Sequence, residues 1–301
     1  MVSPFDPSRN NYSFTKRITG ESLQVLVLEN VDLNGEVFQH ISHFRGLEQL
    51  SVTRASGLNR IRMFGSSVRL KSLVVRNCWN LEIIEICDLP QLAFFEFEGR
   101  PICLDLNSVP NLVKVSLGEY DLEFLKVAFK QLACCLCQLR TLTLDNTLSF
   151  LTQEKVVFPI PQLPELVCLE LRISPDDACV LLQLACFLDA SPRLQKLVLK
   201  LDFLGSGINL WKAESHPHNN LKVVEVIGFF DCPAATDIVT FIVDNAAGLE
   251  SLVIDPVVPW CEHRRGRKPD ELIEKERKGR QHAMSLRSML PGMDGGNSSS
   301  D

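Results

Sequence analysis

The sequence predicts one α/β solenoid of about ten coils built around a curved parallel sheet. Two observations predict it. A six-residue apolar pattern, L-x-x-L-x-L with other aliphatic residues or Phe allowed, recurs along the chain, and its copies follow one another at regular steps. The steps are 20 to 24 residues up to position 112 and 27 or 28 residues from there on. The ten copies begin at Leu23, Leu47, Leu70, Leu92, Leu112, Leu139, Leu166, Leu194, Leu221 and Leu249.

Each copy has the alternation of a β-strand. The fourth and sixth positions are apolar, while the third, fifth and seventh are mixed or polar, so one strand face is buried. A single strand of this kind cannot bury its apolar face alone, but ten strands stacked in register form a continuous core. A period of 20–29 residues with this pattern is the signature of a leucine-rich repeat.

The spacing predicts different secondary structure on the convex side of the two halves of the solenoid. In the first half, weaker copies lie between the main ones, and they predict strands on the convex side: Leu58-Ile61-Met63, Leu81-Ile84-Ile86 and the fragment Ile102-Leu104-Leu106. In the second half the longer inserts predict helices, two of them just after a proline: Asp121–Cys135, Asp176–Leu188 and Ala234–Val243.

The chain divides into four segments. We expect an N-terminal tail at 1–21, the repeat domain at 22–257, a basic and charged segment with a capping helix at 258–290, and a disordered tail at 291–301. The charged segment carries a Lys/Arg-rich run within 263–280, for which a solvated helix from about Asp270 and a nuclear-localisation patch are both open interpretations.

Composition excludes several classes of protein. Hydrophobic residues make up 46% of the chain, and the net charge is −6, which argues against a disordered chain and against general nucleic-acid or membrane binding. No run is apolar enough for a secretion signal or a membrane span. The eleven cysteines then predict reduced thiols and a cytoplasmic or nuclear, monomeric protein.

Motif searches predict no enzyme, no cofactor and no metal. No nucleotide-binding loop, H-E-x-x-H or G-x-S-x-G motif is present. Cys134 and Cys137 have the spacing of a redox or zinc pair, but no second pair follows, so core packing is the preferred interpretation and a redox or metal site the remote alternative. Cys78, at the inward-turning position after a strand, is expected to be structural.

Several stretches resemble the repeat region of plant F-box/LRR (FBD-like) proteins. The resemblance covers about residues 22–290 and is carried by LKSLVVRNCWNLEIIEICDLPQLAFFEFEG (70–99), VPNLVKVSL (109–117), PRLQKLVLKL (192–201), HNNLKVVEVIGF (218–229) and AAGLESLVIDP (246–256). It implies a non-catalytic protein-interaction module, the substrate-recognition part of an SCF-type ubiquitin ligase whose F-box docks on Skp1. Residues 1–22 show no F-box, so a stand-alone repeat scaffold is the alternative, and binding to Skp1 is left open.

The same alternation predicts a binding surface. The third, fifth and seventh positions should form columns on the concave sheet face, about 4.8 Å apart from coil to coil. Aromatic and arginine anchors dominate binding energy, and solenoids bind on their concave face. We therefore expect an acidic-aromatic patch and, two to four coils later, a basic patch to contact a protein partner: Phe94, Glu96, Glu98, Arg172, Lys196 and Lys200.

Overall fold

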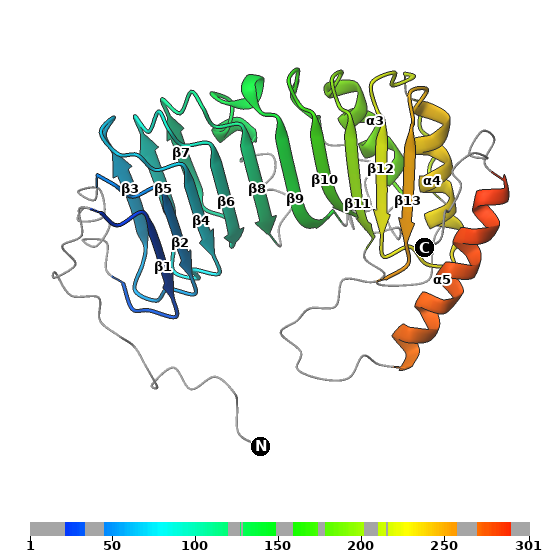
Figure 1. Cartoon of the computed structure of the whole chain (residues 1–301), viewed down its shortest axis with the longest axis horizontal. Helices are drawn as coiled ribbons and strands as arrows, with labels where there is room; N and C mark the ends of the chain where they lie inside the picture. The colour runs from blue at the N-terminus through cyan, green and yellow to red at the C-terminus, as the bar shows by residue number, and fades with distance from the viewer. Residues whose placement is uncertain are drawn as a thin grey trace, which may run out of the picture. The chain divides into compact units, whose positions relative to one another are not determined.

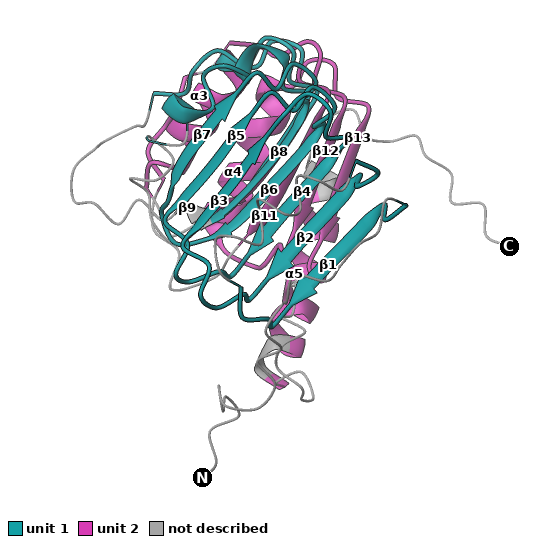
Figure 2. Cartoon of the chain, turned by 90° about the vertical axis from the view of Figure 1, so that its left-hand side faces the viewer, with its two compact units in different colours: residues 1–146, 158–169, 190–193 teal, residues 147–157, 170–189, 194–301 magenta. Residues whose placement is uncertain are grey.

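The computed structural model describes residues 22–33, 45–119, 127, 129–148, 159–173, 178–201, 210–214, 216–257 and 270–289. The chain forms two compact units, coloured separately in Figure 2. Unit 1 comprises residues 1–146, 158–169 and 190–193, and unit 2 comprises residues 147–157, 170–189 and 194–301.

Ten strands form one open sheet, here called the main sheet, in which each strand pairs with the strand of the next repeat (Figure 1). Each strand carries one of the ten apolar patterns, which confirms the predicted leucine-rich-repeat class. The strands, in sheet order, are β1 (Val25–Glu29), β2 (Gln49–Thr53), β4 (Ser72–Arg76), β6 (Phe94–Gly99), β8 (Lys114–Glu119), β9 (Thr141–Leu148), β10 (Cys168–Ile173), β11 (Lys196–Leu201), β12 (Val223–Ile227) and β13 (Ser251–Asp255).

A second parallel sheet lies behind the main sheet in unit 1. It consists of β3 (Arg60–Phe64), β5 (Ile83–Cys87) and β7 (Cys103–Asn107), so the chain passes from one sheet to the other within each coil. These are the three strands that the weaker apolar patterns predict. The fragment at Ile102 forms a full strand, because its two leucines, Leu104 and Leu106, alternate as an inward-facing pair.

The core of unit 1 lies between these two sheets. On β2, Leu50 and Val52 are buried, while the residues between and beside them are half-buried or exposed. The same alternation runs through β4 and β6, and the inner residues of β3, β5 and β7 meet it from the other side. Since parallel pairing keeps equivalent residues in register, as Val52 opposite Val75, the buried side chains stack into continuous rows.

Unit 2 has helices behind its strands. Helix α3 (Val180–Ala190) and helix α4 (Pro233–Asn245) overlap the predicted ranges Asp176–Leu188 and Ala234–Val243, but each ends two residues later than predicted. Helix α3 begins at Val180 and not at Asp176, and Pro233 is the first residue of α4 where it was expected just ahead of the helix. The Sγ of Cys232 caps α4 by accepting a hydrogen bond from the amide of Ala235, at 3.3 Å.

The first predicted helix, Asp121–Cys135, lies partly outside the described residues. In the described part, helical residues end at Gln131, turns continue to Cys135, and a short 3-10 helix, η1 (Leu136–Gln138), follows. Beyond the helical residues, the Sγ of Cys134 donates to the carbonyl of Leu106, and Leu136 is buried.

The residue after many strands has a left-handed backbone. Asn30, Arg54, Asn77, Asp88 and Ser108 have φ between 51° and 59°, and Gly65 and Gly228 hold the same eighth position of their repeats. Asn and Asp tolerate this conformation better than most residues, and glycine adopts it without strain. The positive φ turns the chain sharply out of the sheet at the end of each of these strands.

Helix α5 (Asp270–Met289) packs along one side of the rest of unit 2. Its Leu286 is buried, and Gly279 lies against the carbonyl of Phe229 and the ring of Pro256. The imidazole of His282 stacks on Phe229 and is 2.8 Å from the hydroxyl of Thr236. Among the described residues, none of the helices has the length and apolar character needed to cross a membrane.

Candidate functional site

The candidate site is the outer face of the main sheet, formed by the third, fifth and seventh repeat positions, whose side chains lie opposite the core. All six predicted residues lie on it. Phe94, Glu96 and Glu98 alternate along β6 in unit 1, where they are half-buried or partly exposed. Arg172 on β10, with Lys196 and Lys200 on the adjacent β11, lies in unit 2. The two groups therefore belong to different units.

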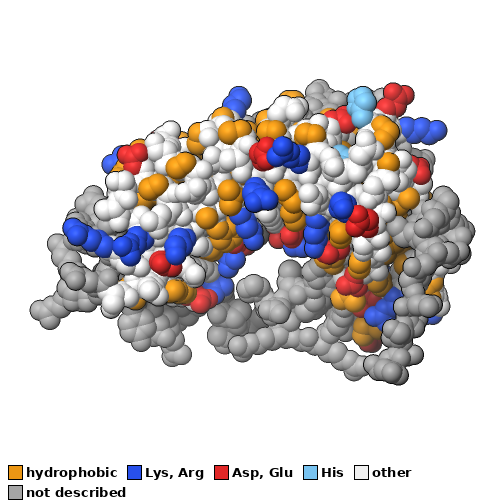
Figure 3. All heavy atoms as spheres, turned by 45° about the horizontal axis from the view of Figure 1, so that its top comes forward, with side chains coloured by type: hydrophobic (Ala, Val, Ile, Leu, Met, Phe, Trp, Pro, Cys, Tyr) orange, Lys and Arg blue, Asp and Glu red, His pale blue; other side chains and the backbone are white. Residues whose placement is uncertain are grey.

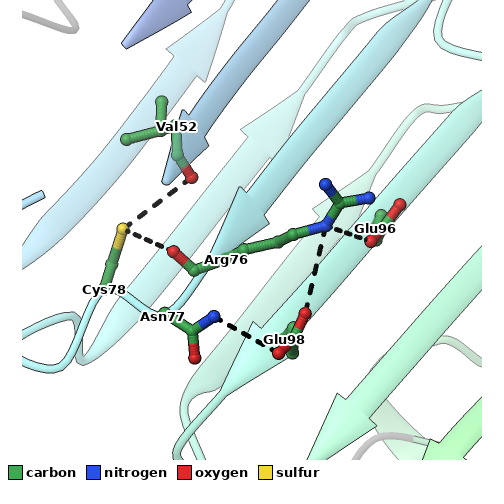
Figure 4. Close-up of polar contacts among 6 residues, drawn as sticks. All are labelled: Val52, Arg76, Asn77, Cys78, Glu96 and Glu98. Carbon is green, nitrogen blue, oxygen red and sulfur yellow. Dashed lines mark hydrogen bonds and ion pairs between the residues drawn. The ribbon is translucent and has the colours of Figure 1, made fainter. Parts of the chain in front are cut away.

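On β6, both glutamates share one basic residue of the neighbouring strand. The Nε of Arg76 is 2.5 Å from Glu96 Oε1 and 4.0 Å from Glu98 Oε2, and Asn77 Nδ2 donates to Glu98 Oε1 at 3.3 Å (Figure 4). The hydrogen bond to Glu96 raises the pKa of Arg76 above its usual value. The Glu96 side chain is 16% exposed and that of Glu98 is 40% exposed, so Glu98 is the more accessible carboxylate.

Phe94 and Glu98 are each positioned by β8, the next strand. The Nζ of Lys114 lies 4.9 Å from the centre of the Phe94 ring, within cation–π range. Opposite Glu98 stands Gly118, and a Cβ added there would be only 3.1 Å from the Glu98 Cγ. The absence of a side chain at this position gives Glu98 room to lie across the strand.

In unit 2 the basic residues also have acidic neighbours on the adjacent strands. The Nζ of Lys196 is 2.7 Å from Glu225 Oε1, and the Nζ of Lys200 is 2.5 Å from Glu170 Oε1. Figure 3 presents another side of the molecule, and there too Lys and Arg side chains lie next to Asp or Glu at several places. The structure thus differs from the sequence-based picture of patches of a single sign.

One rule describes these ion pairs. The three glutamates of the fifth-position column, Glu96, Glu170 and Glu225, are each paired with a basic residue two positions away on a neighbouring strand. Such diagonal neighbours lie roughly 7–8 Å apart at their backbones, within reach of Arg and Lys side chains. We call this arrangement the diagonal ladder.

The diagonal ladder contributes little to stability, because partly exposed ion pairs are worth about 0.2–1 kcal/mol each. Its larger effect is to hold long charged side chains in one arrangement on an accessible surface. The sequence puts Arg76 at a seventh position and Glu170 and Glu225 at fifth positions of their repeats, but they were not predicted as site residues, and neither was Lys114. Reading the third position of each repeat beside that of the next repeat would have placed Lys114 next to Phe94.

The cysteines that the sequence singled out differ in burial. Cys78 is buried, as predicted, and its Sγ lies 3.5 Å from the carbonyl oxygen of Arg76 and 3.9 Å from that of Val52 (Figure 4). Cys134 and Cys137 are exposed, and Cys135 between them is buried. In the part of the chain that the structure describes, no three His, Cys, Asp or Glu residues are grouped so that they could hold a metal ion.

Thiol labelling tests this arrangement. Burial raises the pKa of Cys135 to about 12, with a further contribution from the thiol of Cys134. Because only the thiolate reacts, iodoacetamide at pH 8 should label Cys103, Cys134 and Cys137 in the folded protein and leave Cys135 unmodified. Peptide mass spectrometry gives the readout, and labelling in urea is the control in which Cys135 reacts. Equal labelling of Cys135 and Cys134 without denaturant would contradict the described packing.

Comparison with known proteins identifies the repeat family. A family model described as "At1g61320/AtMIF1, LRR domain" matches residues 11–285. No curated protein matches the chain. Leucine-rich-repeat domains typically bind proteins, and the family is generally non-catalytic. The match covers the whole main sheet, from β1 to β13, and α5 up to residue 285. The chain therefore belongs to the plant family of leucine-rich-repeat domains represented by At1g61320/AtMIF1.

Proposed function

We propose that this protein captures a protein partner on the outer face of its main sheet, the face expected to be concave. The observation that carries the proposal is the diagonal ladder, which presents charged side chains in register on neighbouring strands. The binding residues are the six named from the sequence, Phe94, Glu96, Glu98, Arg172, Lys196 and Lys200, together with Arg76 and Lys114.

Two features favour binding over a merely solvated surface. Phe94 is an aromatic anchor whose ring is already held by Lys114, and Arg76 is an arginine held by Glu96. Aromatic and arginine side chains dominate binding energy at interfaces. Side chains that are ordered before binding lose less conformational entropy when the partner docks, which improves affinity without new contacts.

Charge reversal tests the proposal. We expect the triple variant Glu98→Lys, Arg172→Glu, Lys200→Glu to fold and to bind its partner at least about tenfold more weakly, because each reversal places a like charge opposite the partner's group. The partner is first identified by cross-linking the protein in plant extract, and its Kd is then measured with purified proteins by calorimetry.

The matched control reverses a pair of charges away from this face. Lys222→Glu with Glu250→Lys exchanges the two members of an exposed ion pair, whose Nζ–Oε1 distance is 2.7 Å, before β12 and β13. This variant should keep the original affinity. If the triple variant binds the same partner as tightly as the control does, the proposed binding face is refuted.

A more specific proposal names the pathway: the module serves as the substrate-recognition part of an SCF-type ubiquitin ligase. Its support is the resemblance of the repeats to plant F-box/LRR (FBD-like) proteins. The alternative is a stand-alone leucine-rich-repeat scaffold with no ligase link, and a redox or metal-binding protein through Cys134 and Cys137 is a remote third. A cytoplasmic or nuclear location is the accompanying prediction from the sequence.

Co-precipitation separates these alternatives. The product of the complete gene is mixed with purified Skp1 and with the identified partner. Binding of both supports the ligase receptor, and binding of the partner alone supports the scaffold. Metal analysis of the purified protein tests the metal-binding form of the third alternative, which requires stoichiometric zinc that is lost when Cys134 and Cys137 are replaced by Ser.

A further inference from the structure

A groove opens on the other side of unit 1, away from the outer face of the main sheet. It encloses about 710 Å³ and lies where the strands β3, β5 and β7 begin. That volume falls within the roughly 300–1,000 Å³ range of ligand-binding pockets. Its lining comes from the segments that precede these three strands and from Val127, so no single repeat contains it.

The groove has an apolar floor and an exposed aromatic wall. Leu81 and Ile102 are buried beneath it, as the first inward-facing residues of their coils. Trp79 is 50% exposed and Val127 is 45% exposed, although both are large apolar side chains. An exposed tryptophan beside other apolar groups in a hollow is the arrangement that a docked apolar side chain would cover.

A cation lies on the wall of the groove. The guanidinium of Arg100 lies 5.4 Å from the centre of the Trp79 ring, in a cation–π contact. Within the described ranges, no carboxylate lies within ion-pair distance of Arg100. A guanidinium stacked on a ring keeps its N–H groups directed sideways, where they match the two oxygens of a carboxylate.

The lining of the groove also includes an acidic side chain, that of Glu82. Glu82 precedes β5, and its amide donates to the carbonyl of Asn59 at 2.9 Å, which holds this part of the backbone. Its side chain has no basic partner within 4.0 Å among the residues that the structure describes. This contrasts with the diagonal ladder, where each glutamate of the fifth position is paired.

We propose that this groove is a second protein-binding site, which takes an extended segment of a partner carrying an acidic residue next to an apolar one. The partner's carboxylate binds Arg100, its apolar side chain covers Trp79 above Leu81 and Ile102, and a backbone N–H donates to Glu82. The positive charge of Arg100 is the complement that selects an acidic residue. This site uses no residue of the outer face, so it stands independently of the proposed function.

Blocked tetrapeptides provide the test. The probe is Ac-Gly-Leu-Glu-Gly-NH2, and its matched control is Ac-Gly-Leu-Gln-Gly-NH2, which lacks only the charge. The chain has three tryptophans, and the indole N–H signal of Trp79 is assigned by its loss in Trp79→Phe. We expect the glutamate peptide to shift this signal saturably, with a Kd about fivefold lower than that of the glutamine peptide.

Two variants sharpen the result. In Arg100→Gln the difference between the two peptides should vanish, and in Arg100→Glu the chain should prefer the lysine peptide Ac-Gly-Leu-Lys-Gly-NH2. Both variants change an exposed side chain, and an unchanged urea transition followed by circular dichroism reports that the fold is intact.

The proposal is overturned if no peptide shifts the Trp79 signal up to about 10 mM. It is equally overturned if the glutamate and glutamine peptides bind alike. The triple variant of the outer face should retain the peptide response, so a failure of the groove and a failure of the proposed function are told apart.

Discussion

Replacing Phe95 by Ala should lower the free energy of unfolding by about 3–5 kcal/mol. The Phe95 side chain is fully buried between the two sheets of unit 1, and its removal leaves a cavity that close-packed neighbours on adjacent coils cannot fill. Such a loss is a large part of the roughly 5–15 kcal/mol that stabilises a typical protein. Urea denaturation followed by circular dichroism gives the shift in the transition midpoint.

The neighbouring residue provides the matched control. Phe94 has the same side chain one position earlier, but it lies on the outer face and contacts Lys114. Phe94→Ala removes a partly exposed ring and one cation–π contact, so it should cost about 0.5–1 kcal/mol. If the two variants are destabilised equally, the orientation of β6 described above is incorrect.

Replacing Gly279 by Ala should weaken the packing of helix α5 on the rest of unit 2. This is expected although alanine stabilises a helix by about 1 kcal/mol relative to glycine. An added Cβ would lie 2.5 Å from the backbone carbonyl oxygen of Phe229, closer than real Cβ atoms approach, and 3.1 Å from the Cβ of Pro256, which is a tight contact. Forced overpacking of this kind costs about 1–3 kcal/mol, so the clash outweighs the gain in propensity. The helix must shift or detach to accommodate the methyl group.

Limited trypsin digestion measures this loosening. Exposed basic residues along α5, including Arg277, Lys278 and Arg280, become cleavable when the helix opens. We expect cleavage within α5 to accelerate by about fivefold or more in Gly279→Ala. Met284→Ala is the control, because Met284 is exposed and its replacement should leave the rate unchanged. Unchanged cleavage in Gly279→Ala would show that α5 does not pack closely on Phe229.

The sequence by itself determined which side chains of the repeats face inward. Leu50 and Val52, or Leu73 and Val75, are recognisable because a strand has a period of two and only one face of this sheet is buried. The same period placed Phe94, Glu96 and Glu98 together on the opposite face. The three strands of the second sheet were visible for the same reason, since their apolar residues alternate as well.

The left-handed turns at Arg54 and Ser108 were not readable from the sequence, unlike those at Asn, Asp and Gly residues. Arg54 and Ser108 adopt positive φ there, although neither residue favours it. What imposes the conformation is hydrogen bonding between coils: the amide of Asn30 donates to the carbonyl of Thr53, and that of Arg54 donates to the carbonyl of Arg76. These bonds exist only once the coils are stacked, so local propensity could not predict the turns.

Only the tertiary structure decided which charges meet and where a groove forms. Arg76 stands opposite Glu98 in the sheet register, yet it bonds more closely to Glu96, because a long side chain reaches diagonally across the pleat. Trp79 and Arg100 lie in segments without periodicity and are about twenty residues apart in the chain. They meet because each coil of the solenoid stacks on the coil before it, so that equivalent segments lie next to each other. The sequence pattern within one coil does not show which residues of the neighbouring coil it contacts.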